Sequence, residues 1–83
     1  MAIKIDKAEL TFDNVKEVYE LFKSHLEDNP IEIDFKEVKK VELPHIQMIL
    51  SLKKYCESHN KELKLLNIES NQMKEEFKLF KLL

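Results

Sequence analysis

The 83-residue chain contains no glycine and no tryptophan, and it has only one cysteine and two prolines. Without glycine it has no glycine-rich phosphate loop and no dinucleotide-binding fingerprint. A single cysteine excludes an internal disulfide and is typical of a reducing compartment. Turns that need a left-handed backbone must use asparagine, the residue that tolerates this conformation best after glycine. We expect Asn29, Asn60 and Asn67 to fill these positions.

Long apolar runs are missing as well. No stretch approaches the roughly 18 apolar residues that a membrane-spanning helix requires. Residues 1–6 also lack the apolar core of a signal peptide. We therefore expect a cytoplasmic protein that does not insert into a membrane.

Positive and negative charges are nearly balanced. The chain has 14 basic and 16 acidic residues, a net charge of −2, and its lysines are spread along the sequence. A nucleic-acid-binding protein normally concentrates basic residues on one face, so we expect no nucleic-acid partner. With 43% apolar residues, the chain can build one hydrophobic core but is too short for two domains. We expect a single domain over residues 1–83.

Apolar and charged residues alternate in three short segments, which indicates half-buried strands. These segments are residues 3–5, 31–35 and 63–66. Helical spacing of apolar residues occupies the intervening and final stretches: residues 14–29, stopped by Asn29-Pro30, residues 44–59 and residues 71–80. Residues 11–14 are typical of a helix cap: Asn14 with Glu17 resembles a capping box for the first helix, and Asp13 is a rival cap. The pattern predicts alternating strands and helices, beginning with a strand.

The strand pattern also predicts how the layers are arranged. Lys4, Glu32, Asp34 and Lys64 all occupy the outward phase of their strands, where opposite charges can pair between strands. Strands buried on both faces would read as continuous apolar runs. We therefore expect an α/β fold of two layers, with a small mixed sheet that carries three main helices on one face and a charged face toward water.

The chain resembles the STAS family, the domain shared by sulfate-transporter tails and anti-sigma factor antagonists. The resemblance rests on a strand ending in Ile-Asp-Leu/Phe, a connector with valine, an acidic-Ser/Thr-small-Gly motif, a leucine-rich helix and a strand ending in Leu-Asn. The corresponding stretches here are Ile33-Asp34-Phe35, Val38, Val41-Glu42-Leu43-Pro44-His45, residues 46–52 and Leu63-Lys64-Leu65-Leu66-Asn67. This resemblance implies a STAS-like fold and a protein-binding function.

One motif departs from the family pattern. The resemblance implies that a partner kinase phosphorylates a serine or threonine at the start of the second helix, but Leu43 stands there and cannot accept a phosphate. Glu42 replaces the usual aspartate, and Pro44-His45 replaces the small-Gly pair. We therefore expect an anti-sigma factor antagonist-like regulator or adaptor without the phosphorylation switch. The resemblance implies two partner classes: an anti-sigma-like serine kinase, or the ATPase subunit of an ABC lipid-transport assembly.

The residues that often carry catalysis or metals do not converge. Cys56 lies on the apolar face of its helix with no activating residue at a suitable spacing. His45 and His59 are at opposite ends of one helix, about 20 Å apart, too far to share a metal. We expect no enzyme, no metal and no cofactor.

The helix over residues 44–59 offers a partner-binding surface, because its apolar residues extend beyond one core-facing stripe. Methionine and tyrosine at its edge suit adaptable protein contacts as well as packing. The candidate contact residues are Glu42, Leu43, Pro44, His45, Gln47, Met48, Leu52 and Tyr55. A wide core-facing stripe is an equally good interpretation of Met48, Leu52 and Tyr55. A second function also stays open, the binding of a small molecule or lipid between the sheet and the helices.

Overall fold

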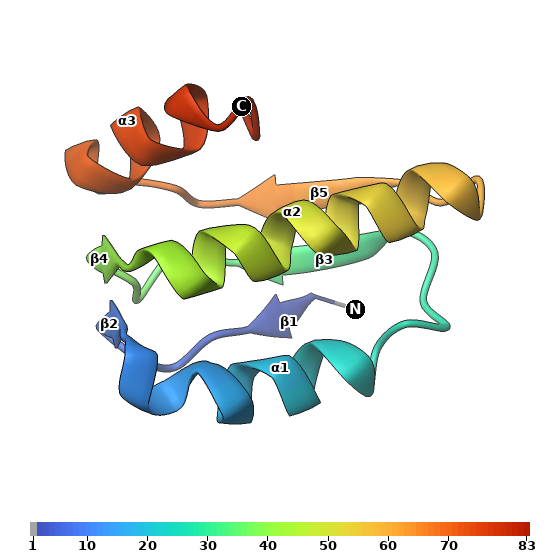
Figure 1. The fold of residues 1–83 in the computed structure, drawn as a ribbon, viewed down its shortest axis with the longest axis horizontal. Helices are drawn as coiled ribbons and strands as arrows, with labels where there is room; N and C mark the ends of the chain where they lie inside the picture. Colours follow the sequence, from blue (N-terminus) through green and yellow to red (C-terminus); the bar gives the residue numbers. More distant parts are fainter. Residues whose placement is uncertain (1) are drawn as a thin grey trace.

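The computed structural model describes residues 2–83 and shows an α/β fold with three helices and a small sheet (Figure 1), as predicted. Its elements are, in chain order, β1 (Ile3–Lys4), β2 (Glu9–Leu10), the short 3-10 helix η1 (Phe12–Asn14), α1 (Val15–Lys23), β3 (Ile31–Asp34), β4 (Lys40–Val41), α2 (Leu43–Ser58), β5 (Leu63–Leu66) and α3 (Asn71–Leu79).

The main sheet has three strands in the order β1-β3-β5, and β2 and β4 form a separate two-stranded pair. Every strand pair in residues 2–83 is parallel. The prediction of a mixed sheet is therefore wrong. The physical reason is that α1 connects β1 to β3 and α2 connects β3 to β5. A helical crossover returns the chain to the same end of the sheet, which makes the next strand parallel.

The two faces of the sheet differ as the alternation predicts. The inward phase carries the fully buried Ile3, Ile31 and Ile33, while Lys4 and Lys64 are exposed and Glu32 is half-buried. In Figure 1, α2 runs across the front of the sheet and α1 runs along its β1 side. The three inward-facing isoleucines therefore pack under these helices, and the charged face of the sheet stays open.

The third helix lies beside β5 (Figure 1). It begins at the cap residue Ser70, whose hydroxyl oxygen accepts a hydrogen bond from the Met73 amide. Met73 and Phe77 are fully buried, and the Phe77 ring meets Phe35 edge-on with centroids 5.5 Å apart. These contacts join α3 to the end of β3 and complete the hydrophobic core.

The structure confirms two of the three expected left-handed asparagines. Asn60 has φ 55° and Asn67 has φ 58°. The prediction for Asn29 is wrong, because Asn29 precedes Pro30 and the proline ring disfavours helical conformations at the preceding residue.

The first helix differs from its prediction at both ends. Asn14 makes no side-chain cap to α1; its Oδ1 instead accepts a hydrogen bond from the Thr11 amide at 3.0 Å. At the other end, α1 stops at Lys23, six residues before Asn29. The Ser24 hydroxyl donates to the Leu21 carbonyl at 2.7 Å, and this kind of local bond competes with continuation of a helix.

Candidate functional site

The start of α2 is held in place by the segment before α1. The Glu42 amide donates to the Leu10 carbonyl at 2.8 Å, and Glu42 Oε1 accepts a hydrogen bond from the Phe12 amide at 2.9 Å. The Glu42 carboxylate therefore bridges to η1 and does not cap its own helix. Pro44 suits the first turn of α2, where the missing N–H has no intrahelical partner to lose.

His45 strengthens this attachment from inside the protein. Its side chain is 0% exposed, and Nε2 donates to the Thr11 carbonyl at 2.7 Å. The other ring nitrogen, Nδ1, has no hydrogen-bond partner among the described residues. The sequence placed His45 on the partner-binding surface, but this burial removes its side chain from any surface contact. His45 anchors the helix start instead.

Apolar side chains are exposed where these two segments meet. Leu43 is 49% exposed, and Phe12, on the partner segment of the Glu42 hydrogen bond, is 72% exposed. We call Phe12, Leu43 and Pro44 the entry patch. Sequence reasoning missed Phe12, because its segment was assigned only to helix capping. The signal was an aromatic residue that fits neither the strand nor the helix spacing around it.

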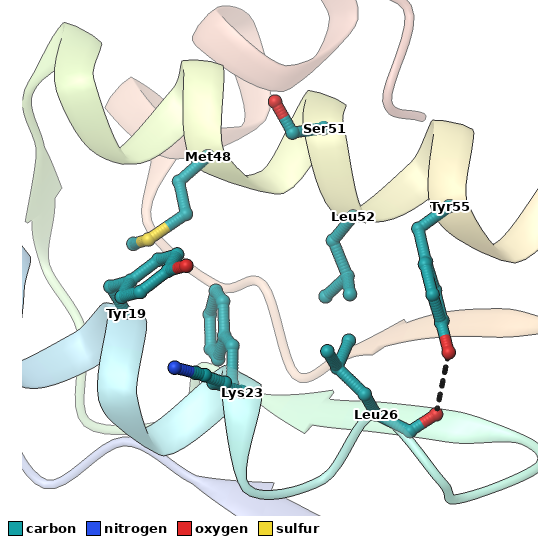
Figure 2. Close-up of a pocket in the computed structure, with 8 residues that line it drawn as sticks. Tyr19, Lys23, Leu26, Met48, Ser51, Leu52 and Tyr55 are labelled. Atoms are coloured by element: carbon teal, nitrogen blue, oxygen red, sulfur yellow. Dashed lines mark hydrogen bonds between the residues drawn. The ribbon is translucent and has the colours of Figure 1, made fainter.

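A groove runs between α1 and α2 (Figure 2). Its inner part is a hollow of about 190 Å³, and a wider hollow of about 420 Å³ adjoins it at the N-terminal ends of the two helices. Tyr19, Met48 and Ser51 line both hollows. We call the combined feature the α1–α2 groove, lined by Val15, Lys16, Tyr19, Phe22, Lys23, Leu26, Pro44, Gln47, Met48, Ser51, Leu52 and Tyr55.

The groove has an apolar floor and a closed end. Figure 2 shows Met48 pointing toward Tyr19, and Leu52 toward Leu26. At the end near Tyr55, the Tyr55 hydroxyl donates to the Leu26 carbonyl at 3.4 Å, and the Lys61 ammonium donates to the same carbonyl. These bonds hold the turn after α1 against the end of α2.

The structure separates the predicted contact residues into three groups. Five of them line the groove: Pro44, Gln47, Met48, Leu52 and Tyr55. Leu52 is only 6% exposed and forms part of the floor, whereas Met48 and Tyr55 are half-buried in its walls. Leu43 lies on the surface outside the groove, and Glu42 and His45 act as anchors. The residues that α1 contributes to the groove were not predicted, because the apolar pattern of α2 does not show which helix packs beside it.

A family comparison identifies the fold. The family model described as "Mlab, STAS domain" matches residues 7–82. The chain belongs to the STAS domain family. STAS domains mediate protein–protein interactions and are generally binding modules without catalytic activity. No curated protein and no solved structure gives a significant match.

In this STAS domain, burial shifts the pKa of Cys56 and hydrogen bonds shift the pKa of Asp34. Cys56 is buried in the core, and burial raises the pKa of its thiol, with a smaller opposing effect of the Lys61 charge. Asp34 accepts hydrogen bonds from the Asn67 side chain and the Lys36 amide, which lower the pKa of its carboxyl group.

Within residues 2–83, no cluster of three or more His, Cys, Asp and Glu residues is placed to hold a metal ion. No helix in the same range is long and apolar enough to span a membrane.

Proposed function

We propose that this STAS domain is a non-enzymatic protein-binding module, an anti-sigma factor antagonist-like regulator or adaptor that docks a partner through the entry patch and the adjoining surface of α2. The observation that carries the proposal is the exposure of Leu43 at the first turn of α2. An exposed apolar cluster is costly to hydrate and often marks a protein-binding surface.

The anchoring bonds support a preformed surface. The Glu42 carboxylate and the buried His45 ring both attach the start of α2 to residues 11–12. Leu43 is therefore presented on a fixed backbone, and a fixed binding surface loses less conformational entropy when a partner binds.

The proposal includes the absence of a phosphorylation switch. Neither Leu43 nor Pro44 has a hydroxyl group. Ser51 is exposed two turns further along α2, and its hydroxyl donates to the Gln47 carbonyl at 3.1 Å. An adaptor that binds without being switched fits this surface better than a phosphorylation relay. We propose a cytoplasmic partner of one of two classes, an anti-sigma-like serine kinase or the ATPase subunit of an ABC lipid-transport assembly.

The small-molecule alternative has less support. The inner hollow of about 190 Å³ lies between two helices. A second hollow of about 430 Å³ lies between β1 and α1, where the sequence suggested a ligand site. The inner hollow is smaller than the roughly 300–1,000 Å³ of ordinary ligand pockets. The hollow beside β1 is large enough, but most of its lining residues are charged, whereas ligand pockets are mostly apolar. A tightly held ligand in native mass spectra of the purified protein would favour this alternative.

Replacing Leu43 with Asp tests the proposed function. The charge would have to be desolvated in the complex, so we expect binding to weaken by about 2–4 kcal/mol. The thermal midpoint should barely change, because Leu43 is half-exposed and a negative charge at the first turn of a helix is favourable by about 0.3–1 kcal/mol. Calorimetry with each candidate partner measures the first quantity and thermal unfolding the second.

Leu79→Asp is the matched control. Leu79 is an exposed leucine on α3, remote in sequence from the entry patch, and its replacement should leave partner affinity unchanged. Normal binding by Leu43→Asp would refute the entry patch as the interface. A collapsed thermal midpoint would instead show that Leu43 belongs to the core.

A further inference from the structure

The charged residues that line the α1–α2 groove are both lysines. Lys16 and Lys23 are its only charged lining residues, and no aspartate or glutamate of residues 2–83 lines either hollow. We propose that the groove receives an amphipathic helix of the partner whose apolar face is bordered by acidic side chains. The inference rests on the proposed function and specifies the chemistry of the partner segment that this STAS domain binds.

The dimensions of the groove fit one helix face. Pro44 and Tyr55 line its two ends and are eleven residues apart on α2, which corresponds to about 16 Å at about 1.5 Å per residue. Helices that dock into apolar grooves use anchors at positions i, i+3 or i+4, and i+7, which span about 10 Å along the helix axis and therefore fit within this length. The half-buried Met48 in the middle provides a flexible wall that adapts to such anchors.

The two lysines impose a spacing on the partner. Lys16 and Lys23 are exposed, lie on the same helix and are seven residues apart, which is about 10 Å along the axis. Two acidic residues seven positions apart on the docked helix would have the same separation. The opposite wall offers the uncharged Gln47 and Ser51, so the charged contacts are confined to the α1 side.

The acidic residues of α1 are directed elsewhere. Glu17 and Glu20 line a different hollow, on the β1 side of the helix, and Glu17 pairs with Lys7 at 2.7 Å. The lining of the groove therefore keeps only the two positive charges, because both acidic residues of α1 border the other hollow. A helix with basic borders would place like charges beside Lys16 and Lys23, which is unfavourable.

Two synthetic helical peptides test the inference. Both carry leucine at positions i, i+3, i+4 and i+7; one has glutamates bordering this face seven positions apart, and the other has lysines there. We expect the acidic peptide to bind more tightly by about tenfold, measured by fluorescence anisotropy, because two rim ion pairs replace two repulsions. Amide shifts in ¹⁵N spectra should map to Tyr19, Met48, Ser51 and Tyr55.

Three variants of the full chain locate the site. The double change Lys16→Glu and Lys23→Glu should reverse the peptide preference, whereas Lys74→Glu with Lys78→Glu on α3 should not. Ser51→Trp places a large ring over both hollows at an exposed helix position and should abolish binding of the acidic peptide. Equal binding of both peptides, amide shifts on the open sheet face, or closure of the groove by a second copy of the chain in solution would each overturn the inference.

The Leu43→Asp variant distinguishes the test of this inference from the test of the proposed function. Leu43 lies outside the groove lining, so Leu43→Asp should leave peptide binding unchanged. If Leu43→Asp weakens native partner binding while neither peptide binds, the inference fails and the proposed function stands. If the acidic peptide binds in the groove while partner affinity is insensitive to Leu43→Asp, the inference stands and docking through the entry patch fails.

Discussion

At the residue scale, His45 explains how the start of α2 is fixed. An imidazole that is fully buried, with one hydrogen bond to the Thr11 carbonyl, combines packing with a polar link that leucine or phenylalanine would not provide. Truncation would create a cavity and leave the Thr11 carbonyl without this donor. The histidine therefore contributes to the binding surface indirectly, by holding the backbone of its neighbours.

His45→Ala should destabilise the protein by about 2–4 kcal/mol, from the lost packing and the lost hydrogen bond together. Chemical denaturation followed by circular dichroism measures this free energy of unfolding. Gln47→Ala, two positions along at an exposed site, is the control and should stay within about 0.5 kcal/mol of the native protein. A loss below about 1 kcal/mol for His45→Ala would contradict the anchoring role.

Asp34 makes stability depend on pH. The Asn67 amide and the Lys36 amide donate to its carboxylate and lower the pKa of Asp34 from its ordinary value of 3.8. A carboxyl group with a lowered pKa in the folded state stabilises the protein above its unfolded pKa, and this contribution is lost as pH falls below about 4.

Asp34→Asn should therefore cost stability at neutral pH and progressively less in acid. Urea unfolding of both proteins at pH 7 and again near pH 3 gives the comparison. A stability difference that stays the same at both pH values would show that the ionised carboxylate of Asp34 does not contribute.

At the element scale, the predictions succeeded where local pattern decides the structure. Alternation located the three main strands, and helical spacing located α2 and α3, because burial of one face imposes these periods. The two-residue strand β2 was not among the three predicted strands, because it is defined by its pairing with β4 thirty-one positions later. The groove was not predictable in the same way, since its walls come from two helices whose packing depends on the whole core. The inward orientation of His45 could not be predicted for the same reason, because its hydrogen-bond partner, the Thr11 carbonyl, comes from a distant segment of the chain.

Ser70 is the element-scale link between α3 and the rest of the fold. Its hydroxyl oxygen accepts from the Met73 amide at 3.4 Å, and the hydroxyl donates to the Lys39 carbonyl at 2.7 Å. Ser70→Ala should cost about 0.5–2 kcal/mol of unfolding free energy, the usual range for an N-cap. Ser51→Ala, inside α2, is the control and should be nearly neutral, because alanine is a good helix former. Equal effects of the two changes would contradict the capping role.

At the scale of the whole molecule, the two sides of the protein have opposite character. On the open sheet face, the register places Lys4 beside Asp34 and Glu32 beside Lys64, so neighbouring strands present opposite charges to each other. The helical side carries the entry patch and the apolar α1–α2 groove with its two lysines. A mixed charged face is suited to contact with water, and the helical side is suited to a protein partner.

Amide hydrogen exchange in the presence and absence of the native partner tests this assignment most directly. Residues buried in an interface exchange more slowly in the complex, and each amide reports its own position. We predict added protection in residues 15–26 and 43–55, with residues 3–4 and 63–66 unchanged. Added protection confined to residues 3–4, 31–34 and 63–66 would place the partner on the open sheet face and contradict the account.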